Sequence, residues 1–161
     1  MLIKRFEESD AVDVLETFLV SWISAYHHKL PTHAFEERVA HITLDYVKHF
    51  AGKKRFCFVA REHRKVTGFI YCKTGALHGT IEQFLVLPEK KRAGFGAELL
   101  EKALHEFRQR HAAKVRAFIL CGEPETLAFY RAQGFQVVKR VFSQAHGGTT
   151  DIYVEKNLLG C

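Results

Sequence analysis

The stretch of sequence that decides the fold is FLVLPEKKRAGFGAELL, residues 84–100. It opens with an apolar run that is typical of a buried strand, and Pro88 ends that run because proline has no N–H for a strand ladder. A turn with Gly94 and Gly96 comes next, and apolar residues at helical spacing follow the turn. The stretch therefore predicts a strand, a glycine turn and a helix in direct succession.

A glycine turn before a helix favours the binding of an anion. The first N–H groups of a helix have no intrahelical acceptor, and the helix dipole adds about half a positive charge there. Gly94 and Gly96 carry no Cβ that would hold a phosphate away from the backbone, and Lys91 and Arg92 add positive charge. The dinucleotide pattern GxGxxG is incomplete because Leu99 replaces its last glycine. A tight turn without a ligand remains the alternative that these residues leave open.

The bulk properties are those of one globular domain over residues 1–161. A net charge of +6 suits an anionic partner, which could be nucleic acid, a membrane surface or a phosphorylated cofactor. No helix-turn-helix, zinc or RNA-binding motif is present, so a nucleic-acid partner is disfavoured. No apolar run approaches the roughly 18 residues of a membrane span, and the first residues lack a signal core. We therefore expect a cytoplasmic protein, monomeric or homodimeric, with no membrane partner.

Cysteine and histidine usage predicts no metal site. The four cysteines are Cys57, Cys72, Cys121 and Cys161, and no two of them form a CxxC pair. The first three lie in apolar runs that are typical of strands. Free thiols in a reducing compartment are the expectation. The histidines around position 30 do not have the spacing of zinc ligands.

The apolar pattern along the chain predicts alternating strands and helices. The predicted elements are a strand over 2–6, a helix over 15–26 capped by Ser9 or Asp10, a second helical stripe over 35–50, strands over 55–60 and 66–72 joined by a turn at 62–64, a strand over 80–87, a helix over 99–107, a strand over 115–120, a helix from Pro124, and strands over 135–142 and 151–154. The central strand-helix-strand unit requires a parallel pair with a right-handed crossover. The prediction is an α/β (α+β) fold with a mixed, mostly antiparallel sheet of about seven strands and helices on both faces.

Two motifs now give the chain a family resemblance. Residues 84–100 resemble motif A of the GNAT (Gcn5-related N-acetyltransferase) superfamily, written R/Q-x-x-G-x-G/A after a strand that ends in Val-x-Pro-Glu. The stretch LAFYRAQGF, residues 127–135, resembles motif B, usually A-x-x-Y-x-x-x-G-F. Residues 21–26 are similar to the first helix of many members. The order of elements matches the family over nearly the whole chain, including a splayed parallel pair at its centre.

The resemblance implies an enzyme that uses acetyl-CoA as co-substrate and needs no metal. It would move the acetyl group to a primary amine of a small molecule or of a peptide or protein, by direct attack in a ternary complex. The pyrophosphate would lie on the amides of the glycine turn, and the pantetheine arm would pair with a strand edge. The cofactor-binding residues implied are Phe84, Leu85, Val86, Lys91, Arg92, Ala93, Gly94, Phe95, Gly96, Ala97, Glu123 and Tyr130.

Three positions depart from the family pattern. Lys91 stands where Arg or Gln is usual, Arg92 where Gly is common, and Glu123 where many members carry an Asn that touches the cofactor. An ionised carboxylate cannot donate a hydrogen bond, so the contact at Glu123 is altered. These departures keep open a second hypothesis, a catalytically silent module that binds acyl-CoA. A basic nucleic-acid-binding protein is the third.

The resemblance also implies catalytic residues. Tyr130 matches the motif B tyrosine, which commonly donates a proton to the sulfur of coenzyme A; a core aromatic is the alternative. Glu82 is the candidate base, since many relatives place a Glu in this strand, although an ungapped alignment puts Thr80 at the usual position. Residues 80 and 82 share a strand face, so Glu82 could act through a water; a surface carboxylate is the alternative. His78, expected in a loop, is a weaker candidate.

The acceptor amine is expected between the first two helices and the loop before the last strand. Trp22, Tyr26 and His27 would line that site together with the loop over residues 142–148. Most of these aromatic residues could instead belong to the core. Nothing in the sequence identifies the amine.

Overall fold

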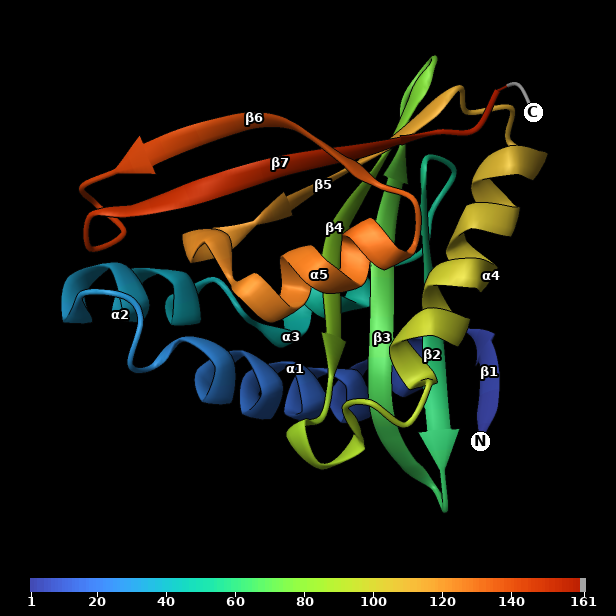
Figure 1. Cartoon of the computed structure of the whole chain (residues 1–161). Helices are drawn as coiled ribbons and strands as arrows, with labels where there is room; N and C mark the ends of the chain where they lie inside the picture. Colours follow the sequence, from blue (N-terminus) through green and yellow to red (C-terminus); the bar gives the residue numbers. More distant parts are fainter. Residues whose placement is uncertain (160–161) are drawn as a thin grey trace.

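A single seven-stranded sheet organises the computed structural model, which describes residues 1–159 (Figure 1). Its strands are β1 (Leu2–Arg5), β2 (Arg55–Glu62), β3 (Lys65–Thr74), β4 (His78–Val86), β5 (Lys114–Ile119), β6 (Gln136–Ser143) and β7 (Thr149–Asn157). The strand order is β1-β2-β3-β4-β5-β7-β6. Only β4 and β5 run parallel, and all other neighbours are antiparallel.

Helices cover both faces of the sheet. They are α1 (Ala11–Tyr26), α2 (Thr32–Ala40), α3 (Leu44–Lys48), α4 (Phe95–Gln109) and α5 (Pro124–Ala132). Strand alternation divides the core between the faces: Ile70 packs with α4 and α5, whereas its neighbour Phe69 packs with α1 and α3. The predicted mixed sheet with helices on both faces is therefore confirmed. Within residues 1–159, no helix is long and apolar enough to cross a membrane.

The parallel pair at the centre of the sheet is short. β4 pairs with β5 only over His78–Ile81, against Lys114–Ala117, and the two strands then diverge (Figure 1). At the same point a β-bulge leaves Glu82 without a register partner in β3, since Cys72 pairs with Ile81 and Tyr71 with Gln83. The result is a V-shaped opening between β4 and β5.

Several local predictions need correction. The helical stripe over 35–50 is two helices, because the Thr43 side chain accepts a hydrogen bond from the Tyr46 N–H (3.2 Å) and starts α3 anew. His78 is the first residue of β4 and does not lie in a loop. Cys121 lies in a turn after β5, whereas Cys57 and Cys72 lie in strands as expected. Cys161 is outside the described residues.

Glycine packing fixes how α4 lies on the sheet. A Cβ at Gly79, in β4, would overlap the ring of Phe107 from α4. The absent side chain lets the end of α4 approach β4 directly, next to the parallel pair. This close contact holds the C-terminal end of α4 against the start of β4. The N-terminus of α4 lies near the other end of β4 (Figure 1).

A buried carboxylate joins β1 and β2 to the start of α1. Asp10 is at the N-cap position, but its side chain makes no cap bond to α1, and Ser9 makes none either. Instead, Lys4 Nζ and Arg61 Nη2 donate to the Asp10 carboxylate (2.6 and 2.7 Å), as does the Glu7 N–H (2.8 Å). Burial pushes the pKa of Asp10 up, but these hydrogen bonds outweigh it, and the pKa lies below its ordinary value.

We predict that Asp10→Asn lowers the free energy of unfolding at pH 7 by about 2 kcal/mol, as expected for lost hydrogen bonds to charged groups. Because the folded pKa is depressed, the stabilisation is present above the ordinary carboxyl pKa and is lost as the pH falls through the folded pKa. Urea denaturation of both proteins at pH 7 and in acid measures the difference. A loss of equal size at both pH values would contradict the prediction.

Candidate functional site

The glycine turn presents a row of backbone donors. Arg92 and Gly94 have positive φ values of 67° and 86°, and α4 begins at the next residue. Backbone hydrogen bonding of α4 begins at Glu98, whose N–H donates to Gly94 O (3.1 Å). Among residues 1–159, the N–H groups of residues 94–97 have no backbone acceptor. This arrangement suits a phosphate, as the sequence predicts.

Aromatic rings flank this row of donors. A Cβ at Gly96 would lie 3.7 Å from the ring of Phe129 and 3.8 Å from that of Phe84. Phe84 comes from β4 and Phe129 from α5, and their ring centroids are 5.8 Å apart. The turn therefore lies next to the diverging part of β4, where Phe84, Leu85 and Val86 have no strand partner on the β5 side.

Charges around the turn are partly engaged. Arg92 donates to Glu125 of α5 (2.9 Å), and both side chains are exposed. Lys90 donates to Glu62 (2.7 Å), whereas Lys91 is exposed and forms no ion pair with the described residues. Lys91 and Arg92 thus flank the turn with positive charge, but the charge of Arg92 is shared with a carboxylate.

Tyr130 lies in α5 beneath the opening. Only 4% of it is exposed, and its ring packs against Phe84, Phe129 and Phe135 at centroid distances of 6.4, 5.7 and 5.0 Å. Burial raises the pKa of its phenol well above the ordinary value, so the hydroxyl is protonated at neutral pH. The hydroxyl makes no hydrogen bond to residues 1–159 and can donate one to a ligand.

Glu123 follows the turn after β5 and is the N-cap residue of α5. Its carboxylate pairs with Lys29, which follows α1, at 2.5 Å. Burial, together with the charges of Cys121 and Glu123, raises the pKa of Tyr26 to about 12. The Tyr26 ring packs on Trp22 at 5.0 Å. Glu123 therefore ties the start of α5 to the end of α1.

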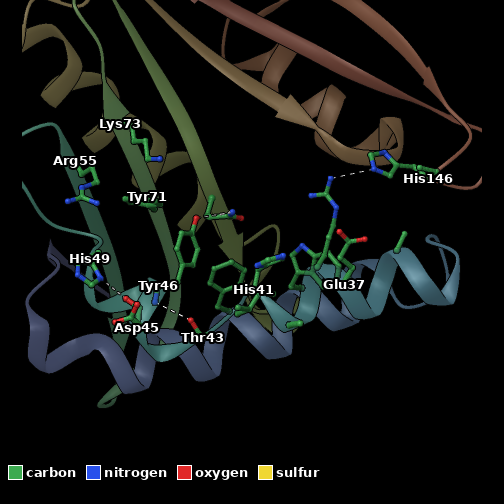
Figure 2. Close-up of a pocket in the computed structure, with 18 residues that line it drawn as sticks. Glu37, His41, Thr43, Asp45, Tyr46, His49, Arg55, Tyr71, Lys73 and His146 are labelled. Atoms are coloured by element: carbon green, nitrogen blue, oxygen red, sulfur yellow. Dashed lines mark hydrogen bonds between the residues drawn. The ribbon is translucent and has the colours of Figure 1, made fainter.

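A cavity of about 910 Å³ lies on the α1–α3 face of the sheet (Figure 2). Its walls come from α1, α2, α3, β2, β3, β4 and the β6–β7 loop. We call it the acceptor cavity, because the sequence predicts the acceptor between these helices and this loop. It is lined by Phe18, Trp22, Ala34, Glu37, Arg38, Ala40, His41, Ile42, Thr43, Asp45, Tyr46, His49, Arg55, Tyr71, Lys73, Gln83, Ala145 and His146. The cavity occupies the region expected for the acceptor.

Only some of the residues predicted for the acceptor site line the cavity. Trp22 lines the cavity, and Tyr26 packs behind it. His27 is exposed just after α1, outside the lining, and its ring is tilted against that of His28 with the centroids 3.5 Å apart. The loop over residues 142–148 reaches the cavity through Ala145 and His146.

Glu82 is exposed in the β4 bulge and is not among the residues that line the acceptor cavity. Its neighbour Gln83 lines the cavity and donates to the Tyr46 hydroxyl (3.3 Å). Burial raises the pKa of Tyr46, the hydrogen bond from Gln83 lowers it in part, and the charge of Glu82 raises it further. Glu82 makes no hydrogen bond to residues 1–159, so it is free to contact water or a ligand.

Sequence reasoning missed a histidine–aspartate pair beside the cavity. His146 Nδ1 lies 2.7 Å from Asp151 Oδ2, and the Cys121 N–H donates to Asp151 Oδ1 (2.8 Å). Asp151 is 4% exposed. The hydrogen bond holds the His146 ring with Nε2 3.4 Å from Arg38 of α2. His146 and Asp151 come from one hairpin, whereas the register of β7 beside β5 brings Asp151 to Cys121. Within residues 1–159, no three His, Cys, Asp or Glu side chains are grouped for a metal ion.

Comparison with known proteins agrees with this architecture. The model of the acetyltransferase (GNAT) family matches residues 14–135. No curated protein shows a significant sequence match.

Solved structures of acetyltransferases share the fold over almost the whole chain. The PaiA N-acetyltransferase of Thermoplasma acidophilum, in complex with coenzyme A, has a TM-score of 0.82 at 18% identity, covering 98% of this chain and 99% of its own. The Escherichia coli N-acetyltransferase for an alanine of a ribosomal protein has a TM-score of 0.77 at 16% identity, covering 99% and 95%. The aminoglycoside 6'-N-acetyltransferase of Enterococcus faecium has a TM-score of 0.76 at 12% identity, covering 100% and 99%.

Proposed function

We propose that this chain, which belongs to the acetyltransferase (GNAT) family, moves the acetyl group of acetyl-CoA to a primary amine by direct attack in a ternary complex. One observation carries the proposal: the unpaired N–H groups of residues 94–97 lie beside the open edge of β4. The acceptor cavity meets the same strand at its bulge. Two ligands can therefore approach β4 from different sides.

The cofactor side would be built mostly from backbone. The pyrophosphate would accept hydrogen bonds from the amides of residues 92–97, with the side chains of Lys91 and Arg92 nearby. The pantetheine arm would lie along residues 84–86 as an added strand. A structural neighbour in complex with coenzyme A supports this choice of ligand. Glu123, engaged by Lys29, would form a wall and donate no hydrogen bond.

The transfer would proceed within the opening between β4 and β5. The amine nitrogen attacks the thioester carbon, the C–S bond of the tetrahedral intermediate breaks, and the sulfur takes a proton. Tyr130 is the proposed donor of that proton, because its hydroxyl is protonated, buried and without a protein partner. A backbone N–H of β4 near Val86 would stabilise the oxyanion.

Glu82 is the proposed base. It would remove the amine proton directly or through a water, from its exposed position in the bulge. His146 is the competing base, since Asp151 orients its ring and its side chain lines the acceptor cavity. Trp22 and Tyr26 would shape the acceptor side, and His27 lies at its margin.

We predict that Gly96→Val weakens acetyl-CoA binding by tenfold or more. The branched side chain would fill the space between the amides and the rings of Phe84 and Phe129. Glu101→Val, on the exposed surface of α4, is the matched control and should bind as the wild type does. Isothermal calorimetry measures both. Absence of binding to the wild type at millimolar acetyl-CoA would refute the proposed cofactor.

We predict that thiol release from acetyl-CoA depends on an amine and that Tyr130→Phe lowers kcat by about 10²–10⁴-fold on the best acceptor, as for loss of a positioned acid. The panel includes small amines and peptides, because structural neighbours are named for aminoglycoside and protein acceptors. Phe135→Leu, a core change next to Tyr130, controls for altered packing. Binding of acetyl-CoA without release with any amine would favour the silent module.

We predict that Glu82→Gln lowers kcat/KM and removes the acidic limb of the pH–rate profile, because the amide cannot accept the amine proton. His146→Gln is measured alongside. If the limb persists in Glu82→Gln and disappears in His146→Gln, the base is His146. The exposed change Glu101→Gln should leave the profile unaltered.

A further inference from the structure

The acceptor cavity has a cationic end that the transfer chemistry leaves unexplained. Arg55 and Lys73 lie there with Tyr71, whereas His146 and Glu37 lie at the opposite end (Figure 2). Arg55 is half-buried and Lys73 is exposed. We call the first two residues the basic pair.

Strand register brings the basic pair together. Arg55 of β2 and Lys73 of β3 are direct partners in the antiparallel ladder, two positions from the pair formed by Cys57 and Tyr71. Strand alternation places both on the face covered by α1 and α3, because Tyr71 and Cys57 belong to the core of that face. Like charges directly opposite one another destabilise a sheet. The fold therefore tolerates a repulsion at the cavity wall.

No carboxylate relieves this repulsion within the described residues. Every other cation of β2, β3 and β5 has a carboxylate partner; these are Arg61 with Asp10 and Asp13, Lys65 with Glu89, and Lys114 and Arg116 with Glu155. Arg55 and Lys73 form no salt bridge, although Glu37 and Asp45 line the same cavity. The Arg55 guanidinium lies beside Gly52 and interacts with the Tyr71 side chain, but neither cation has a carboxylate partner among the described residues, and an anionic ligand would supply one.

We propose that Arg55 and Lys73 bind a carboxylate or phosphate group of the acceptor, so that the acceptor is an anionic amine. This inference rests on the proposed acetyl transfer. Arginine presents paired donors that match either anion, and lysine adds a point charge. Tyr71 pairs with Gln83 at the β4 bulge, and Lys73 lies two residues further along β3. Two strand residues span about 7 Å, which sets the separation of the amine nitrogen from the anionic group.

The test compares acceptors that differ only in charge. One arm of the experiment tests a carboxylate and compares ε-aminocaproate with its carboxamide. The other arm tests a phosphate and compares aminobutyl phosphate with aminobutanol. Spermidine represents polycationic amines. In the wild type, kcat/KM should favour at least one anionic amine over its neutral match by about tenfold to a hundredfold, as for charged hydrogen bonds. The arm with the larger ratio identifies the anion. A ratio near one in both arms, or a preference for spermidine, would overturn the proposal.

Substitution of the basic pair tests whether these two residues cause the kcat/KM preference for the anionic amine. The double variant Arg55→Gln with Lys73→Gln should bring the ratio close to one, whereas Lys102→Gln, an exposed change on α4, should keep it. The double variant should also melt at or above the wild-type temperature, since a like-charge pair is removed. An unchanged ratio in the double variant would refute the assignment.

A binding measurement separates this inference from the proposed function. Inorganic phosphate and acetate are titrated at constant ionic strength into isotope-labelled protein, and amide shifts are followed by NMR. Saturable shifts at residues 55–57 and 71–73 that vanish in the double variant would support the anion site even if no amine were acetylated. Absence of such shifts would refute the site even if acetyl transfer were observed.

Discussion

The short parallel contact between β4 and β5 is the constraint on which the rest of the molecule depends. Four residue pairs join these strands, and a bulge at Glu82 coincides with the point where they separate. Beyond that point the backbone of β4 keeps β3 on one side only. The open edge of β4 is partly exposed, and its N–H and C=O groups need water or another partner there. A ligand that pairs with this edge satisfies those groups, so the opening favours an extended, amide-bearing molecule.

The two faces of the sheet offer different chemistry to ligands at this opening. On the α4–α5 face, the donors are backbone amides at the start of α4, flanked by aromatic rings. Such a site depends on chain geometry, so Lys91 and Arg92 can replace the family's usual residues and still supply their N–H groups. On the α1–α3 face, the cavity is lined by side chains, among them Arg55 and Lys73. Side chains can change without altering the fold, which suits the proposed role of this face in selecting the acceptor.

Contacts between distant parts of the chain hold the two faces together around the site. Lys29, after α1, pairs with Glu123 at the start of α5, and Arg38 of α2 contacts His146 of the β6–β7 loop. These contacts link the N-terminal helices to the start of α5 and to the β6–β7 loop. Lys29 and Glu123 form a partly exposed ion pair, which contributes little stability, so it positions α5 more than it stabilises the fold.

The sequence by itself determined the elements whose signals are local. Glycine spacing in residues 84–100 and the Tyr130 motif identify the turn, α4 and α5, because each depends on neighbours within a few residues. The split between α2 and α3 was not predicted from the sequence. The apolar spacing continues across the split, and the break depends on the capping residue Thr43. Only the tertiary structure showed which side chains meet around the acceptor cavity. The Arg55–Lys73 pair depends on the register of β2 and β3, and the contact of Asp151 with Cys121 depends on how β7 lies beside β5; no periodicity of the sequence indicates either.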